Sequence, residues 1–260
     1  MKKIGLALGG GGAKGLAHIP LLEVFDELGI RPHRISGTSI GAIMGAFYAS
    51  GISGKRIRDG VDRMIINKGD GFREALKKKE VLKWFEFLDL DFRRGGVFKG
   101  DKFIEFLYES MGASTFEELE IPLQLVATDF WSSEQVVLNE GDLLSAVKAS
   151  IGLPGVFTPV VREERVLIDG GAVNPVPHDL LNESCDIVVA IDVLGDRKPD
   201  EKSNLPHIVD ALLHTFTLMQ NSIVQGKKKL QPPDIFIRPA IQDVEILEFY
   251  KAETIYQQAE

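Results

Sequence analysis

Two glycine-containing turns, each following a short apolar run, constrain this chain most. Four consecutive glycines, Gly9 to Gly12, follow the run from Ile4 to Leu8, and Gly37-Thr38-Ser39-Ile40-Gly41 comes after the next short run. A glycine-rich turn leaves backbone N–H groups free to point at an anion, and a Gly-x-Ser-x-Gly turn lifts a serine hydroxyl off the end of a strand. Together they predict an α/β scaffold that carries out acyl transfer on a serine.

The apolar periodicity along the chain predicts strands alternating with helices. Strands are expected at residues 4–8, 33–36, 123–128, 135–138, 166–168, 187–193 and 235–237. Helices are expected at residues 16–28, 40–49, 55–66, 74–88, 101–111, 142–150, 205–225 and 244–258. This order predicts a three-layer α/β fold, with a mainly parallel sheet, helices on both faces and ligands beyond the carboxyl ends of the strands. We expect one domain over residues 1–260, with a C-terminal helical region from about residue 200.

Composition excludes several classes of protein. The formal net charge of −8 argues against nucleic acid as the main partner. Cys185 is the single cysteine, so no internal disulfide can form, which fits a reducing cytoplasm. The apolar run after Met1 is too short for a secretory signal, and no run approaches the ~20 apolar residues of a membrane span. We expect a cytoplasmic protein whose membrane contact, if any, is peripheral.

Ser39 is the candidate nucleophile. Gly37 and Gly41 leave room for a tight strand-to-helix turn, and the helix that follows presents its positive N-terminal end to an alkoxide or oxyanion. The alternative interpretation is a small-residue turn in which Ser39 serves only as a helix N-cap.

The glycine run fits more than one kind of site. Gly10, Gly12 and Gly15 match the dinucleotide-binding pattern, but the acidic residue that pattern needs about 20 positions later is absent. A phosphate-binding loop also fails, because Gly15 follows Lys14 where Ser or Thr is required. The remaining use is an oxyanion hole built from the N–H groups of Gly10, Gly11 and Gly12, with Lys14 as a nearby cation; a merely flexible turn is the alternative.

The nucleophile also needs a base. Asp169 is the strongest candidate, because it ends a buried strand and the two glycines after it, Gly170 and Gly171, keep the approach open. The five histidines stand in no catalytic setting and are interpreted as structural: His18, His33, His178, His207 and His214. Two other strand-ending carboxylates, Asp129 and Asp192, are interpreted as bonding loop amides. No cysteine pair or His-Glu-x-x-His pattern supports a metal site, and we expect no cofactor.

Taken together, four segments resemble a known family, the patatin-like phospholipases of the patatin and neuropathy-target-esterase group. They are Gly9-Gly10-Gly11-Gly12-Ala13-Lys14-Gly15, Gly37-Thr38-Ser39-Ile40-Gly41, residues 149–159 and Asp169-Gly170-Gly171. The resemblance spans about residues 3–195. It implies a Ser39–Asp169 dyad without histidine, the amides of Gly10 to Gly12 as oxyanion site, and hydrolysis of lipid esters, most of all phospholipids or lysophospholipids. Two positions depart from the family pattern: Lys14 stands where arginine is commoner, and Gly152 where a small side chain is usual.

The middle of the chain is a candidate lipid-contacting region. Within residues 76–88, Lys77-Lys78-Lys79 precede one apolar helical face, which predicts either an interfacial helix near acidic head groups or a helix that covers the acyl pocket or the core. Apolar residues elsewhere in 72–98 extend this surface and are interpreted as a mobile cap. The alternative to an enzyme is a non-catalytic regulatory or adaptor protein that keeps the fold and binds a partner or an acyl ligand.

Overall fold

The computed structural model describes residues 2–66, 112–195 and 208–260. The helices expected at residues 74–88 and 101–111, the cap at residues 72–98 and His207 lie outside these ranges. The strands are β1 (Ile4–Leu8), β2 (Arg34–Thr38), β3 (Leu123–Asp129), β4 (Gln135–Leu138), β5 (Val160–Arg162), β6 (Arg165–Asp169), β7 (Ile187–Ile191) and β8 (Ile235–Ile237). The α-helices are α1 (His18–Glu27), α2 (Ile40–Ala49), α3 (Gly54–Ile66), α6 (Leu143–Ser150), α7 (Ile208–Leu230) and α8 (Ala252–Ala259).

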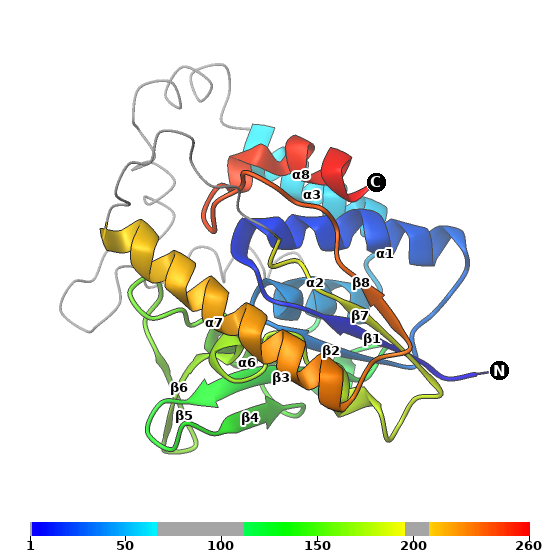
Figure 1. Ribbon diagram of the computed structural model, residues 1–260. Coiled ribbons are helices and arrows are strands. Elements are labelled where there is room, and N and C mark those ends of the chain that lie inside the picture. Colours follow the sequence, from blue (N-terminus) through cyan, green and yellow to red (C-terminus); the bar gives the residue numbers. More distant parts are fainter. Residues whose placement is uncertain (1, 67–111, 196–207) are drawn as a thin grey trace.

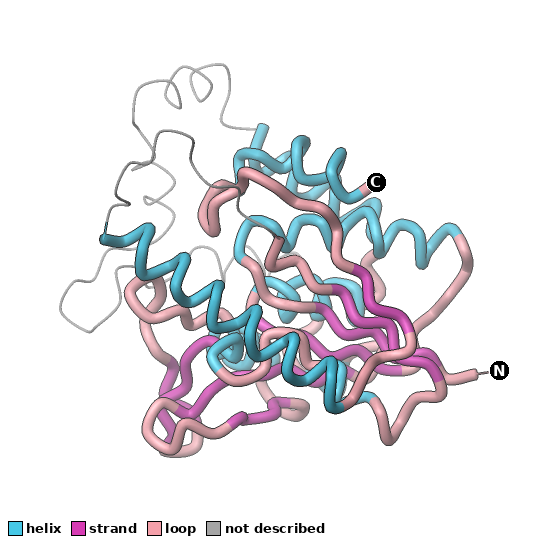
Figure 2. Tube along the Cα trace, in the orientation of Figure 1, coloured by secondary structure: helices cyan, strands magenta, loops and turns pink. Residues whose placement is uncertain are grey.

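One sheet runs through the described part of the chain, as Figures 1 and 2 show. Its strand order is β5-β6-β3-β2-β1-β7-β8, and β4 pairs with β3 outside this path. The strands from β3 through β2, β1 and β7 to β8 are parallel neighbours, whereas β4, β5 and β6 pair antiparallel. The predicted mainly parallel sheet is therefore confirmed, and β8 joins the C-terminal region to the same sheet.

Side chains alternate between the two faces of the sheet and meet a different layer on each. Leu6 and Leu8 of β1 lie in the main core with α1, α2 and α6, whereas Ala7 between them belongs to a smaller cluster that includes Val224 of α7. Figure 1 shows α7 crossing one side of the sheet while α1, α3 and α8 lie together on another part of the molecule. Because both faces of β1 are buried, its run is apolar without polar alternation, as parallel strands require.

The strand β6, which ends at Asp169, runs antiparallel to its neighbour β3. Leu125 and Val126 of β3 pair with both β2 and β4, while Ala127 and Thr128 pair with both β4 and β6. A strand has only two edges, so β2 and β6 share the edge of β3 opposite β4. Since β6 is antiparallel to β3, the carboxyl ends of β2 and β6 meet head to head there.

The remaining differences from the sequence prediction are local. The strand β5 was not predicted, because three residues with no clear alternation carry too little signal. The helix expected at residues 16–28 begins as a 3-10 helix, η1 (Gly12–Ala17), before α1. Pro20 is the third residue of α1 and so falls in the first turn of that helix, where proline is tolerated best.

Candidate active site

Ser39 lies in a strained turn between β2 and α2. Its backbone has φ 56° and ψ −125°, a conformation that non-glycine residues rarely adopt and that costs about 1–3 kcal/mol. The turn can be this tight because a Cβ on Gly41 would overlap the carbonyl oxygen of Leu8, and one on Gly37 would lie 2.6 Å from the carbonyl oxygen of Gly41. Ser39 stands at the N-cap of α2 but makes no side-chain capping bond. The interpretation of Ser39 as a cap alone is therefore wrong.

The hydroxyl of Ser39 points to Asp169. Ser39 Oγ donates a hydrogen bond to Asp169 Oδ2 over 2.7 Å, although the two residues lie 130 positions apart. The register of β3 explains the meeting, because Val126 pairs with Thr38 and the next residue, Ala127, pairs with Asp169. The end of each strand thus delivers one member of the pair.

Asp169 has the properties of a base in a dry site. Asp169 is 3% exposed, and this burial raises the pKa of its carboxyl to about 6. Hydrogen bonds from Ser39 Oγ and the N–H of Gly171 act in the opposite direction and offset part of that rise. Gly171 N–H donates to Oδ1 over 2.7 Å, which leaves Oδ2 for the serine. A raised pKa makes the carboxylate a stronger proton acceptor, because burial disfavours its charged form.

Two of the four described histidines, His18 and His178, hydrogen-bond to backbone carbonyls away from the Ser39–Asp169 pair. His18 is fully buried, its Nε2 donates to the carbonyl of Gly9 over 2.8 Å, and burial lowers its pKa to about 4. His178 lies against the carbonyls of Val176 and Gln231. Within residues 2–66, 112–195 and 208–260, no histidine hydrogen-bonds to Ser39 or Asp169. The geometry therefore favours a two-residue arrangement over a triad.

The glycine turn lies beside the serine but offers fewer free amides than the sequence predicts. A Cβ on Gly10 would lie 3.2 Å from the Cβ of Ser39, so the turn borders the candidate nucleophile. The N–H of Gly10 donates to the carbonyl of Pro175 over 2.9 Å, which corrects its assignment as an oxyanion donor. The N–H groups of Gly11 and Gly12 have no acceptor among the described residues, and Gly12 holds the positive φ of 59° that turns the loop. Of the three glycine amides predicted to donate to an oxyanion, those of Gly11 and Gly12 remain candidates.

Lys14 joins the glycine turn to the segment after β7. It is 8% exposed, and its Nζ donates to the carbonyl of Leu194 over 2.7 Å. The role of Lys14 as a cation for the oxyanion stays a prediction. Gly15 packs closely on the first residue of α2, because a Cβ there would overlap the side chain of Ile40.

Three residues that the sequence did not single out as site residues border the pair. Ser150 at the end of α6 accepts the N–H of Ser39 over 2.9 Å, and Thr128 Oγ1 donates to the carbonyl of Asp169 over 2.9 Å. Gln220 of α7 is 5% exposed, and a Cβ on Gly171 would overlap its Nε2 while lying 2.9 Å from Asp169 Oδ1. No local pattern reveals these contacts, since each joins distant parts of the chain.

The other strand-ending carboxylates bond loops, as predicted. Asp129 Oδ1 accepts the N–H of Trp131 over 3.0 Å, and Asp192 Oδ1 accepts the N–H of Leu194 over 3.0 Å. Asp192 also pairs with Arg238 over 3.1 Å. In the parts of the chain that the structure describes, no three His, Cys, Asp or Glu side chains gather closely enough to hold a metal ion.

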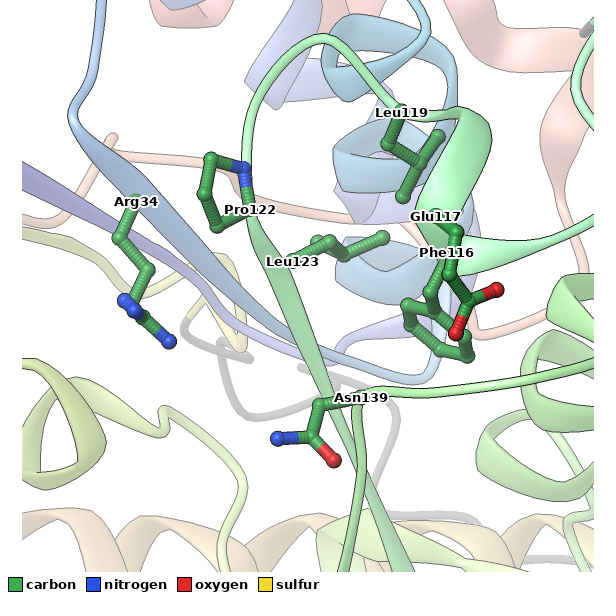
Figure 3. A pocket seen from close by; sticks show the side chains of 7 residues that line it. All are labelled: Arg34, Phe116, Glu117, Leu119, Pro122, Leu123 and Asn139. Atoms are coloured by element: carbon green, nitrogen blue, oxygen red, sulfur yellow. The ribbon is translucent and has the colours of Figure 1, made fainter.

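A pocket of about 200 Å³ lies away from this site, at the amino ends of β2 and β3 (Figure 3). It is lined by Arg34, Phe116, Glu117, Leu119, Pro122, Leu123 and Asn139. Both strands run from this pocket towards the dyad, so the pocket and the dyad occupy opposite ends of the sheet. No helix among the described residues has the length and apolar character needed to cross a bilayer.

Comparisons with known proteins match the part of the chain that contains Ser39 and Asp169. The family model for patatin-like phospholipase matches residues 6–182. Neuropathy target esterase sws of Drosophila melanogaster is 36% identical over 194 residues, which cover 73% of this chain and 13% of that protein. An uncharacterized NTE family protein of Mycobacterium tuberculosis is 28% identical over 207 residues, which cover 79% of this chain and 53% of that protein.

A solved structure shares the fold. VipD from Legionella pneumophila aligns with a TM-score of 0.53 and 16% identity, over 99% of this chain and 66% of that one. The alignments therefore cover about half of the mycobacterial relative and a much smaller part of the fly protein.

Proposed function

The chain belongs to the family of patatin-like phospholipases, and we propose that it is a serine acyl hydrolase that cleaves carboxylic esters of lipids through a Ser39–Asp169 dyad. The observation that carries the proposal is the 2.7 Å hydrogen bond from the hydroxyl of Ser39, held in a strained elbow, to a buried carboxylate. A hydrogen bond from the serine hydroxyl to a base is the contact through which serine is activated as a nucleophile.

In the first step an acyl group passes to the enzyme. Asp169 Oδ2 takes the proton of Ser39 Oγ as that oxygen bonds to the ester carbonyl carbon. The N–H groups of Gly11 and Gly12 stabilise the resulting oxyanion, and the N-terminal end of α2 adds a favourable dipole. When the tetrahedral intermediate collapses, the C–O bond to the leaving alcohol breaks and Asp169 returns the proton to that alcohol. An acyl-Ser39 ester remains.

In the second step water releases the acid. Asp169 accepts a proton from water as the water oxygen attacks the acyl carbonyl carbon, and the same amides stabilise the new oxyanion. The bond to Ser39 Oγ then breaks, Asp169 protonates the serine, and a carboxylic acid leaves. The dyad returns to its starting protonation state without a cofactor.

Fast ester hydrolysis requires both the oxyanion donors and the general base, because each contributes several kcal/mol to lowering the barrier. Removing one oxyanion donor typically costs about 3–4 kcal/mol of barrier, and general-base catalysis contributes roughly 10²- to 10⁴-fold. A carboxyl with its pKa raised to about 6 suits the base, because it is mostly ionised at neutral pH yet accepts a proton more readily than an exposed aspartate.

Covalent labelling tests the proposal directly. A fluorophosphonate probe should label the wild-type protein at Ser39, whereas Ser39→Ala should show no labelling and Asp169→Asn a loss of at least about 100-fold in rate. Ser36→Ala is the matched control, because Ser36 is a buried serine of β2, three residues before Ser39, and its Oγ donates to the carbonyl of Pro177. A folded wild-type protein that does not label would instead favour a binding or adaptor role.

The substrate class is the finer part of the proposal. The family resemblance favours phospholipids or lysophospholipids, with peripheral contact between the protein and the membrane that supplies them. Lipid profiles of cells that produce wild-type protein or Ser39→Ala should differ in one class of ester and its released fatty acid. Accumulation of a class in the Ser39→Ala sample identifies the substrate, and identical profiles would contradict a lipid ester as substrate.

A further inference from the structure

The end of α6 contacts both members of the dyad through groups that take no part in the chemistry. Ser150 is fully buried, and its Oγ accepts the N–H of Ser39 over 2.9 Å while donating to the carbonyl of Val126 over 2.7 Å. Two residues later, the carbonyl of Gly152 accepts the N–H of Asp169 over 3.0 Å. One short segment thus bonds the backbone of the nucleophile and the backbone of the base.

The hydroxyl of Ser150 is fixed in direction by these two bonds. A serine hydroxyl has one proton, and the Val126 carbonyl takes it, so the oxygen can only accept from Ser39. Val126 itself pairs with Thr38 in the sheet. The Ser39 N–H is therefore tied, through one side chain, to the strand whose register brings the dyad together.

The bond also changes what Ser39 can do. With its N–H donated to Ser150, Ser39 cannot contribute its own amide to an oxyanion. The same bond holds the positive-φ backbone of Ser39 in the orientation that directs Oγ at Asp169. Glycine suits position 152 in this segment, because a side chain there would be crowded: its Cβ would lie 3.1 Å from the carbonyl oxygen of Ala149.

We propose that Ser150 is a positioning residue that fixes the Ser39 backbone so that its hydroxyl stays within hydrogen-bonding reach of Asp169. The proposal rests on the hydrolase function proposed above, but the amide contact itself can be measured without any turnover. Small displacements of reacting groups can lower rates by about 100-fold, which sets the scale of the expected effect.

Ser150→Ala is the informative variant. It removes one oxygen and adds no atom, so the buried site has room for it. We expect kcat for a soluble ester to fall about 10- to 100-fold while KM stays within about twofold, because the loss affects the geometry of the nucleophile and leaves ester binding intact. The rate of fluorophosphonate labelling should fall by a similar factor.

Ser36→Ala is the control for mere loss of a buried hydrogen bond. Ser36 is also fully buried, and its Oγ donates to the carbonyl of Pro177 over 2.8 Å, without contact to the dyad. Both variants should lower the melting temperature by a few degrees, and Ser150→Ala by more, because it leaves the N–H of Ser39 without its acceptor as well as one buried carbonyl without its donor. Only Ser150→Ala should lower kcat and the labelling rate.

Nuclear magnetic resonance of serine-¹⁵N protein separates this inference from the proposed activity. The Ser39 amide is identified as the resonance missing from Ser39→Ala. In Ser150→Ala it should move upfield and exchange faster with solvent, and in Ser36→Ala it should not move. An unchanged Ser39 amide in Ser150→Ala, an unchanged kcat, or an equal loss of kcat in Ser36→Ala would each overturn the proposal. If wild-type protein shows no turnover while the Ser39 amide responds as expected, the contact stands and the hydrolase function fails.

Discussion

Replacing Asp169 by asparagine should make the protein inactive and, at alkaline pH, more stable. The reason is the cost of keeping a charge in a dry site. Burial raises the pKa of the carboxyl from 3.8 to about 6, so the folded state disfavours the carboxylate by about 3 kcal/mol relative to the unfolded chain, at about 1.4 kcal/mol per pKa unit. Asparagine carries no charge and retains an oxygen for the N–H of Gly171.

The difference in stability between Asp169→Asn and the wild type should grow as pH rises. Between about pH 4 and pH 6 the folded wild-type protein binds more protons than the unfolded chain, so its stability falls as pH rises and levels off above about pH 7. Asp169→Asn removes this dependence. The variant should therefore be more stable than the wild type by about 2–3 kcal/mol at pH 8, and nearly equal at pH 4. For a chain of this size that corresponds to about 4–12 °C in melting temperature.

Thermal unfolding at both pH values, followed by circular dichroism or calorimetry, measures the difference. Comparing variant with wild type at each pH cancels other titrations, including that of His18, whose lowered pKa affects both proteins alike. Asp192→Asn is the control, since Asp192 is also a buried strand end but pairs with Arg238. It should lose stability at pH 8. A melting temperature for Asp169→Asn below that of wild type at pH 8, by the same margin as at pH 4, would refute the reasoning.

The geometry around Asp169 and the glycine turns predicts three further effects. If Asp169 is the base, kcat/KM should rise through an acid limb with its midpoint near pH 6 and show no second limb up to about pH 8, as a pH–rate profile would record. Gly171→Ala should lower kcat at least about 10-fold, because its Cβ would overlap Gln220 Nε2 and crowd Asp169, and steady-state kinetics measures this. Gly41→Ala should destabilise the fold by about 1–3 kcal/mol through its overlap with backbone, whereas Gly45→Ala, which meets only side-chain atoms at 3.2 Å and beyond, should cost less; denaturant unfolding compares the two.

The parts of the site that could be predicted are those that a local pattern encodes. Four apolar residues and a glycine specify β1 well enough that its predicted and observed bounds agree, and the apolar helix after Ser39 begins at Ile40, as expected from the elbow pattern. Five residues therefore suffice to predict Ser39 as the candidate nucleophile. Asp169 was a weak local signal, and only its resemblance to a family pattern linked it to Ser39.

The parts that could not be predicted depend on contacts between distant segments. Whether Gly10 keeps its N–H free depends on where Pro175 lies, and no periodicity in either segment places that carbonyl. Ser150 lies in the segment 149–159 that resembles the family pattern, but that pattern does not predict that its Oγ accepts the N–H of Ser39. Hydrogen bonds of this kind follow from the register of strands, which is set by packing over the whole sheet.

The direction of β6 decides whether this sheet can hold a dyad at all. A fully parallel sheet would gather its strand ends at one edge, which is the reasoning that predicts Ser39 and Asp169 to be neighbours. In the structure β2 already occupies the first part of one β3 edge, so β6 can pair only with the rest of it, at Ala127 to Asp129. Running antiparallel, β6 brings its carboxyl end next to that of β2. A parallel β6 in the same place would bring its amino end there and carry Asp169 on the order of 10 Å away, at about 3.3 Å per residue. The antiparallel direction of β6 therefore places Asp169 beside Ser39, because β2 already fills the first part of the β3 edge with which β6 pairs.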